Sequence, residues 1–186
     1  MKRSFDIFLS LMALSVLVLP LCLMSLVICL TTRGPCLYWS DRVGRHSKIF
    51  KMPKFRTMRI DTPTVATHLL ENPEQWLTPT GSLLRKTSLD ELPQLWSILK
   101  GDMSFVGPRP ALFNQFDLVQ LRRESGVDKL LPGLTGWAQV NGRDELPIPE
   151  KVKFDIEYMQ NMSFIFDIQI IWMTIKKVLS KDGVSH

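Results

Sequence analysis

The sequence lacks the signatures of several common enzyme classes. It has no G-x-x-x-x-G-K-[ST] phosphate loop, no G-x-G-x-x-G fingerprint and no H-E-x-x-H motif. Its three histidines (His46, His68 and His186) are scattered, and its three cysteines (Cys22, Cys29 and Cys36) form no Cys-x-x-Cys pair. These absences disfavour an ATPase, a dinucleotide enzyme and a zinc site. The odd cysteine count, with two cysteines in an apolar run, predicts buried and reduced thiols.

The composition is neither that of a disordered tail nor that of a polytopic membrane protein. Hydrophobic residues make up 45% of the 186 residues and charged residues 22%. This length suits one domain with one core, plus an anchor. The net charge of +5 fits an anionic membrane surface, a nucleotide or a nucleic acid, and does not choose among them.

Residues 7–30 form a long run without any charged residue. A straight helix of this length reaches about 36 Å, enough to cross a bilayer core of about 30 Å. A cleaved signal peptide is disfavoured because the run is too long, no A-x-A-like site follows it, and Asp6 lies among the early positive charges. A single spanning helix and a re-entrant hairpin remain.

The residues on either side of this run bear on that choice. Lys2 and Arg3 precede it, and Arg33 follows it, whereas a simple span keeps only one basic flank in the cytoplasm. Pro20 favours a kink in the middle. The two legs, 7–19 and 20–30, measure about 20 and 16 Å, so each reaches mid-bilayer and neither spans alone. Proline kinks also occur in spanning helices, so both topologies remain open on physical grounds.

Local patterns predict the elements of the remaining chain. Residues 35–43 and 48–58 read as a β-hairpin, and 61–81 as an excursion around a short helix at 71–76. Residues 91–100 read as a helix that ends at Gly101. The residues expected on its buried face are Leu92, Leu95, Trp96 and Leu99.

Further helices are predicted at 111–125 and 150–161, with an irregular segment at 130–143. Residues 164–181 form an apolar helix that ends in lysines. Its aromatic and basic residues suit a membrane interface, and its apolar residues equally suit the core.

Asp90 and Glu91 are adjacent carboxylates at a predicted helix start. Pro93 is tolerated only near the beginning of a helix, which places that start at about residues 88–91. One interpretation is helix capping, because Ser88 and Glu91 have capping-box spacing and Asp90 can itself cap. The other is chemical, because two carboxylates at a helix N-terminus can hold Mg²⁺ together with a substrate phosphate. Adjacent side chains on a helix diverge by about 100°, so one would face the substrate and one would support it.

Arginines in stiff turns are candidates for phosphate binding. Arg109 lies between Pro108 and Pro110, which restrict the backbone on both sides of it. A rigidly held guanidinium is a good bidentate phosphate ligand. Arg143 follows a glycine-rich segment in the same way, and Lys54 and Arg85 add cations outside obvious helical faces.

Long motifs resemble the small monotopic phosphoglycosyl transferases, also called bacterial initiating sugar transferases. The resembling segments include KRSFDI at 2–7, RGPCLYWSDRVGR at 33–45, KFRTM at 54–58, LLRKTSLDELPQLWSILKGDMSFVGPRP at 83–110 and PGLTGWAQVNGR at 132–143, with Asp155 and Tyr158. The resembling segments extend from about residue 2 to 184 and follow the same order as in the family.

The resemblance implies a fold and a location. The fold is α+β and mainly helical, with a re-entrant helix at 1–32 and a cytoplasmic catalytic domain at 33–186. That domain would hold a small β-hairpin and amphipathic helices on the membrane interface. The location implied is the cytoplasmic face of the bacterial inner membrane, and the partners implied are membrane lipids and downstream glycosyltransferases, with no nucleic acid.

The resemblance also implies an activity, the transfer of a phosphosugar from a UDP-sugar to undecaprenyl phosphate with Mg²⁺. Asp90 would be the nucleophile and lie on the metal, and Glu91 would assist. Lys54, Arg85, Arg109 and Arg143 would contact phosphates. The product would be the first membrane-bound intermediate of a bacterial glycan. The alternative is a non-catalytic scaffold of a glycan assembly complex.

Two segments depart from the family pattern. Leu19 precedes Pro20 where the family often has serine, which weakens the assignment of a re-entrant bend but not that of an anchor. The 61–81 segment has Thr78, Pro79, Thr80 and Gly81 where a basic residue is often found, so no substrate contact is carried over there.

Overall fold

The fold comes from a computed structural model and is described for residues 2–32, 34–63, 72–142 and 146–180. The α-helices are α1 (Lys2–Thr31), α2 (Gly81–Lys86), α3 (Gln94–Lys100), α4 (Phe116–Glu124), α5 (Trp137–Val140), α6 (Ile148–Gln160) and α7 (Phe164–Ser180). The strands are β1 (Leu37–Val43), β2 (Ile49–Phe55), β3 (Ser104–Val106), β4 (Ala111–Leu112) and β5 (Gly133–Thr135). Short 3₁₀ turns are η1 (Arg45–Ser47), η3 (Pro73–Trp76), η4 (Leu89–Glu91) and η5 (Val127–Lys129). The protein is mainly helical with small sheets, as predicted.

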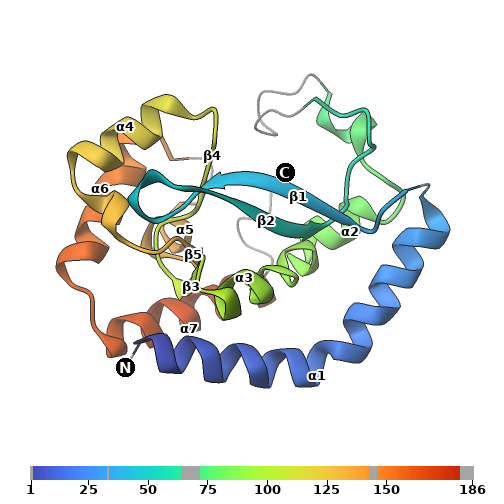
Figure 1. Ribbon diagram of the computed structural model, residues 1–186, viewed down its shortest axis with the longest axis horizontal. Helices are drawn as coiled ribbons and strands as arrows, with labels where there is room; N and C mark the ends of the chain where they lie inside the picture. Colours follow the sequence, from blue (N-terminus) through green and yellow to red (C-terminus); the bar gives the residue numbers. More distant parts are fainter. Residues whose placement is uncertain (1, 33, 64–71, 143–145, 181–186) are drawn as a thin grey trace.

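The predicted β-hairpin is confirmed and forms the centre of the structure (Figure 1). Strands β1 and β2 pair antiparallel in a register that sets Ser40 opposite Met52 and Tyr38 opposite Lys54. Strand β4 adds to β1, so the sheet order is β2-β1-β4. Even-numbered residues of the hairpin share one face because side chains alternate along a strand. Met52 on this face is buried against α3.

Helix α3 lies between the hairpin and the first half of α1 (Figure 1). Its buried residues Leu95 and Ile98 pack with Met52 and Met103, and Ala13, Leu14 and Leu17 of α1 cover this cluster. The helix ends at Gly101, which has the left-handed φ of 99° that glycine tolerates. The predicted burial of Trp96 is wrong, since this side chain is 59% exposed. Its position faces away because α3 turns Gln94 and Ser97 inward, toward the hairpin and α1.

Helix α1 is one continuous element that passes through Pro20 and bends (Figure 1). Its first half packs on α3, and beyond Pro20 its buried residue Ile28 packs with Phe55 and Leu84. Among the described residues, α1 is the one helix long and apolar enough to cross a membrane. The helix thus contains the predicted proline and is bent, whereas the re-entrant topology stays a prediction. Cys22 and Cys29 are free thiols but exposed on α1, so their predicted burial is wrong.

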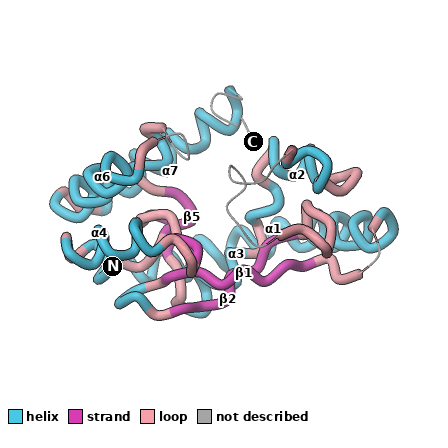
Figure 2. Tube along the Cα trace, turned by 90° about the horizontal axis from the view of Figure 1, so that it is seen from above, coloured by secondary structure: helices cyan, strands magenta, loops and turns pink. Residues whose placement is uncertain are grey.

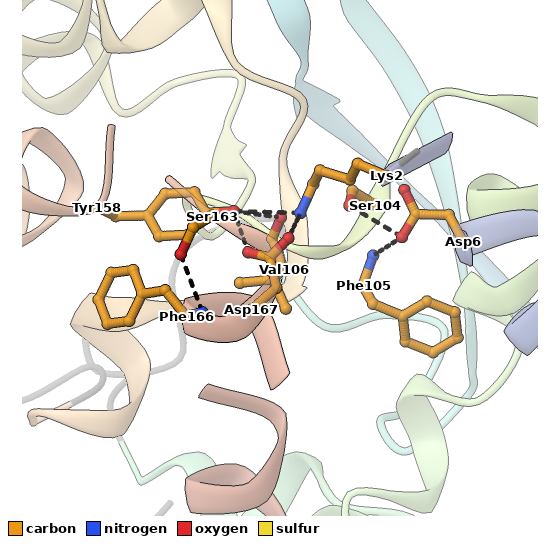
Figure 3. A network of polar contacts seen from close by, with 9 residues as sticks. All are labelled: Lys2, Asp6, Ser104, Phe105, Val106, Tyr158, Ser163, Phe166 and Asp167. Carbon is orange, nitrogen blue, oxygen red and sulfur yellow. Dashed lines mark hydrogen bonds and ion pairs between the residues drawn. The ribbon is translucent and has the colours of Figure 1, made fainter. Parts of the chain in front are cut away.

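The start of α1 is tied to the rest of the fold by polar contacts (Figure 3). The ammonium of Lys2 lies 2.5 Å from the Asp167 carboxylate of α7, and the Tyr158 hydroxyl donates to the same carboxylate over 2.7 Å. The buried Asp6 accepts hydrogen bonds of 3.1 Å from the Ser104 hydroxyl and the Phe105 backbone N–H. Because both carboxylates are buried and paired, they fix how α1 enters the structure.

The C-terminal half surrounds the short parallel pair β3 and β5. Helices α4 and α6 pack on each other (Figures 1 and 2), and α5 contacts both α6 and α7. The predicted helices at 150–161 and 164–181 are confirmed as α6 and α7, and the one at 111–125 is shorter because β4 takes its first residues. The expectation of an irregular 130–143 segment is wrong in part, since it contains β5 and α5.

Helix α7 has one buried face and one exposed apolar face, so both of its predicted roles have a surface that suits them. Ile170 is fully buried in a cluster with Val106, Val140 and Tyr158. On the other side Ile165 is 80% exposed, and Phe164 and Trp172 are more than half exposed. One face of α7 therefore belongs to the core, and the other leaves an apolar surface that suits a membrane interface.

Candidate active site

Asp90 and Glu91 lie in η4, the single turn that precedes α3. The turn begins after Ser88, whose left-handed φ of 56° redirects the chain out of α2. No side-chain capping bond forms at Ser88 or at Pro93, so the capping interpretation is wrong. Both carboxylates are nevertheless buried, with 8% and 9% of each residue exposed. Buried carboxylates without a capping role point toward a chemical one.

Glu91 is held by two cations from distant parts of the chain. Its Oε1 accepts from Lys54 Nζ on β2 over 2.8 Å and from Arg109 Nη2 over 3.3 Å. Lys54 reaches it because the even-numbered face of β2 looks toward η4. Arg109 reaches it from the Pro108–Pro110 turn after β3. Three residues predicted from the sequence are thus brought together.

Asp90 differs from its neighbour because its carboxylate has no hydrogen bond or ion pair within the described part of the chain. Burial raises the pKa of Asp90, and the nearby Glu91 carboxylate raises it further, while Lys54, Arg85 and Arg109 oppose the rise. An anionic Asp90 is therefore stabilised by cations close by, with none of them bonded to it. Such a carboxylate is available to a substrate or a metal.

Lys54 and Arg85 both act on Asp90 through their charge. Burial lowers the pKa of Lys54, against the opposing attraction of Glu91. Arg85 stands on α2, where its Nε donates to the Thr57 hydroxyl over 3.0 Å. Burial lowers the pKa of Arg85 and the charge of Asp90 raises it. The fourth predicted cation, Arg143, lies outside the described residues.

Arg42 belongs to this site and was not among the predicted site residues. It shares a small cleft with the Glu91 cluster; the lining residues are Arg42, Met52, Lys54, Glu91, Gln94, Arg109 and Pro110. Arg42 comes from β1, and its charge contributes to the lowered pKa of Lys54. The signal that points to it is the hairpin register, because Arg42 and Lys54 are both even-numbered residues of one two-stranded face.

Two arginines hold the backbone of the Arg109 turn through hydrogen bonds to its carbonyls. Arg122 Nη1 donates to the Arg109 carbonyl over 2.7 Å, and Arg42 Nη1 donates to the Pro110 carbonyl over 3.1 Å. Arg122 is itself fixed by Asp155 of α6, with Nη2 2.7 Å from the carboxylate. Asp155 is 1% exposed, and burial raises its pKa while Arg122 opposes the rise. The turn that presents Arg109 is therefore anchored in the core.

The carboxylate pair also fits a divalent cation that arrives with a phosphate substrate. The described residues contain no cluster of three or more acidic, histidine or cysteine ligands. Mg²⁺ is commonly held by one or two carboxylates, with substrate phosphates and water completing its shell. Asp90 has the required hard oxygen ligands and no competing partner in the described chain. The donor set thus suits Mg²⁺ bound jointly with substrate.

Known proteins resemble this chain over its whole length. It matches the bacterial sugar transferase family over residues 1–181. It is 38% identical to the uncharacterized sugar transferase EpsL of Bacillus subtilis, with 100% of this chain and 91% of that protein covered. It is 39% identical to an undecaprenyl-phosphate galactose phosphotransferase of Salmonella typhimurium, with 98% of this chain and 41% of that protein covered.

A third relative comes from Escherichia coli. The chain is 38% identical to its UDP-glucose:undecaprenyl-phosphate glucose-1-phosphate transferase, with 95% of this chain and 40% of that protein covered. The chain thus spans less than half of these two longer relatives and most of EpsL. The aligned part includes the hairpin, the carboxylate pair and the Arg109 turn described above, and the chain belongs to the bacterial sugar transferase family.

Proposed function

We propose that this protein transfers a phosphosugar from a UDP-sugar to undecaprenyl phosphate through a covalent intermediate on Asp90. The observation that carries the proposal is the contrast between the two carboxylates. Glu91 is bound by Lys54 and Arg109, whereas Asp90 is buried beside the same cations without a bonded partner among the described residues. Relatives with 38–39% identity are named for undecaprenyl-phosphate sugar transfer.

In the first step an Asp90 carboxylate oxygen attacks the β-phosphorus of the UDP-sugar. The bond between that phosphorus and the bridging oxygen breaks, and UMP leaves with the electron pair. The phosphosugar remains on Asp90 as an acyl phosphate. Lys54, Arg85 and Arg109 offset the negative charge that otherwise repels a carboxylate from a diphosphate. Glu91 keeps Lys54 and Arg109 in place.

In the second step a phosphate oxygen of undecaprenyl phosphate attacks the same phosphorus and releases Asp90. The covalent intermediate lets a hydrophilic donor and a hydrophobic acceptor use one site in turn. Mg²⁺ bound at Asp90 would supply Lewis-acid stabilisation of the diphosphate charge. The apolar α1 and the exposed face of α7 would hold the site at the membrane, on the cytoplasmic face of the bacterial inner membrane.

The activity is tested by mixing the purified protein with UDP-sugars, Mg²⁺ and undecaprenyl phosphate and measuring UMP. We expect UMP release with one sugar or a few related sugars, and loss of release when Mg²⁺ is removed by a chelator. Absence of UMP with every sugar would instead favour the non-catalytic scaffold. The same screen identifies the sugar.

The pKa shifts predict a pH dependence of kcat/KM, which reports the free enzyme. Asp90 attacks as the anion, and burial raises its pKa above the ordinary value. Activity should therefore fall on the acid side at a higher pH than for an exposed aspartate. Lys54→Met removes a charge that lowers this pKa, so the acid limb should move to still higher pH.

Lys54→Arg is the matched control because it keeps the charge, and its acid limb should stay near that of wild type. The measurement is UMP release between about pH 4 and pH 9. An acid limb that does not move in Lys54→Met, or that moves to lower pH, would contradict the assigned role of Lys54.

A re-entrant α1 predicts that both of its ends are accessible from the cytoplasm only. Ser4→Cys and Pro35→Cys place single thiols at exposed positions near the two ends, after the three native cysteines are replaced by serine. A membrane-impermeant maleimide should label both thiols in inside-out vesicles and neither in intact spheroplasts. Labelling of the two thiols from opposite sides would establish a spanning helix instead.

A further inference from the structure

Arg56 is a buried arginine whose guanidinium is only partly bonded. It follows β2, and the residue is 6% exposed. Its Nη2 donates to the Thr32 hydroxyl over 2.5 Å and lies 3.4 Å from the Thr32 carbonyl. Its Nε and Nη1 are buried and have no hydrogen-bond partner in the part of the chain that the structure describes. One N–H on Nε and two on Nη1 are therefore left without an acceptor.

Buried N–H groups without acceptors destabilise a folded protein. A guanidinium stays charged at all accessible pH values, and a buried charge normally has a counter-ion and hydrogen bonds. Arg122 of the same protein is buried to a similar degree, and it bonds both the Asp155 carboxylate and the Arg109 carbonyl. No described carboxylate forms an ion pair with Arg56. The difference points to an anion that Arg56 takes from outside the chain.

The contact with Thr32 explains only one nitrogen of the group. A basic side chain at a helix C-terminus stabilises the last carbonyls, and Nη2 does so at the end of α1. Nε and Nη1 form no hydrogen bond with Thr32 or with any other described residue. A side chain added at Gly34, which has a φ of 107°, would lie 2.6 Å from Nη1 and 2.7 Å from Ile60 Cδ1. Glycine thus lets Nη1 and Ile60 pack closely against the backbone here, and Ile60 itself is 70% exposed, so the guanidinium lies just beneath the protein surface.

The position of Arg56 selects the kind of anion. It adjoins the last turn of α1, where the apolar segment ends at Thr31. That end packs through Ile28 against Phe55 and Leu84. If α1 lies in a membrane as proposed above, its C-terminal end lies at the depth of the lipid headgroups, where the abundant anion is phosphate.

We infer that Arg56 binds the phosphate of a membrane lipid where α1 leaves the bilayer. The inference rests on the proposed membrane placement and not on the transfer chemistry. The ligand is a lipid phosphate with an apolar tail along α1, and the guanidinium supplies charge-assisted hydrogen bonds to its oxygens. Bound lipid would provide the acceptors that Nε and Nη1 lack.

The test measures how lipid raises the unfolding temperature of the full chain in an uncharged maltoside detergent. The probes are dioctanoyl phosphatidate, the matched neutral dioctanoylglycerol, and inorganic phosphate, all without donor sugar or Mg²⁺. The variants are Arg56→Met and Arg56→Lys. Arg59→Met is the control, because it removes an exposed arginine from the same segment.

Phosphatidate should stabilise wild type and Arg59→Met equally, and dioctanoylglycerol and inorganic phosphate should do so far less. Arg56→Met should weaken the apparent affinity for phosphatidate by about tenfold or more. If Arg56→Met does not fold, the Arg56→Lys variant is used instead. Lysine keeps the charge but not the planar donors, so its apparent affinity for phosphatidate should fall by about threefold or more.

Three results would overturn the inference: unchanged phosphatidate affinity in the Arg56 variants, equal stabilisation by dioctanoylglycerol, or equal stabilisation by inorganic phosphate. Catalysis is not read out in this experiment. A chain that binds phosphatidate through Arg56 but never releases UMP would keep this site and lose the proposed function.

Discussion

Asp90→Asn is expected to lower UMP release by at least ~10⁴-fold, the scale of losing a covalent nucleophile. Asparagine fills the same volume but cannot form the acyl phosphate. Since Asp90 has no bonded partner in the described chain, the substitution breaks no contact and should leave the unfolding temperature unchanged or raise it. Burial raises the pKa of Asp90, which means that its charge is costly inside the fold, so removing that charge acts in the same direction.

The controls separate chemistry from structure. Asp41→Asn changes an exposed carboxylate on the outer face of the hairpin and should keep full activity. Glu91→Gln should lose activity and also loosen Lys54 and Arg109, because both bind Oε1. Unchanged UMP release by Asp90→Asn would remove Asp90 from the mechanism.

Arg109→Met is expected to lower kcat/KM by ~10²–10³-fold, the scale of removing one charged transition-state contact. Arg109 lies in a turn between two prolines, and its carbonyl is held by Arg122. Asp155→Asn weakens that hold from a distance, so we expect a smaller loss of about tenfold, mainly in kcat. Asp155 is thus a positioning residue that acts through Arg109.

A double-mutant cycle distinguishes this positioning from general destabilisation. If Asp155 acts through Arg109, Asp155→Asn should cost little further activity once Arg109 is methionine, whereas its effect on the unfolding temperature should persist. Full additivity of the two activity losses would contradict the coupling. Lys151 lies on the same helix, and its charge also acts on Asp155. Lys151→Met is therefore the control for a change of charge near Asp155.

The elements that the sequence predicted well are those with a strong local pattern. The hairpin around Gly44–Ser47, the helices at 150–161 and 164–181 and the end of α3 at Gly101 all follow from turn residues and periodicity. Strands β3, β4 and β5 span only two or three residues each, and their pairing is set by partners far along the chain. Such short non-local strands leave no periodic signal. Trp96 was misplaced for a related reason, since contacts with the hairpin and α1 decide which face of a seven-residue helix is buried.

The site residues that were predicted are those that lie in segments with a strong local pattern. Asp90, Glu91 and Arg109 lie in segments with distinctive proline and carboxylate motifs, and the structure brings them together with Lys54. Arg42 carries no motif of its own and enters the site only through strand register. Helix geometry already predicted that the two carboxylates face different ways, but only the fold shows that Glu91 is the one bonded by Lys54 and Arg109.

The most direct test of the account is to look for the phosphosugar on Asp90. Wild-type protein is incubated with its UDP-sugar and Mg²⁺ but without undecaprenyl phosphate, then digested in acid and examined by mass spectrometry. The account predicts at most one UMP per protein and a hexose-phosphate or related adduct on the peptide that carries Asp90, absent from Asp90→Asn. UMP release that requires the acceptor, with no adduct on that peptide, would contradict a covalent intermediate and favour direct transfer.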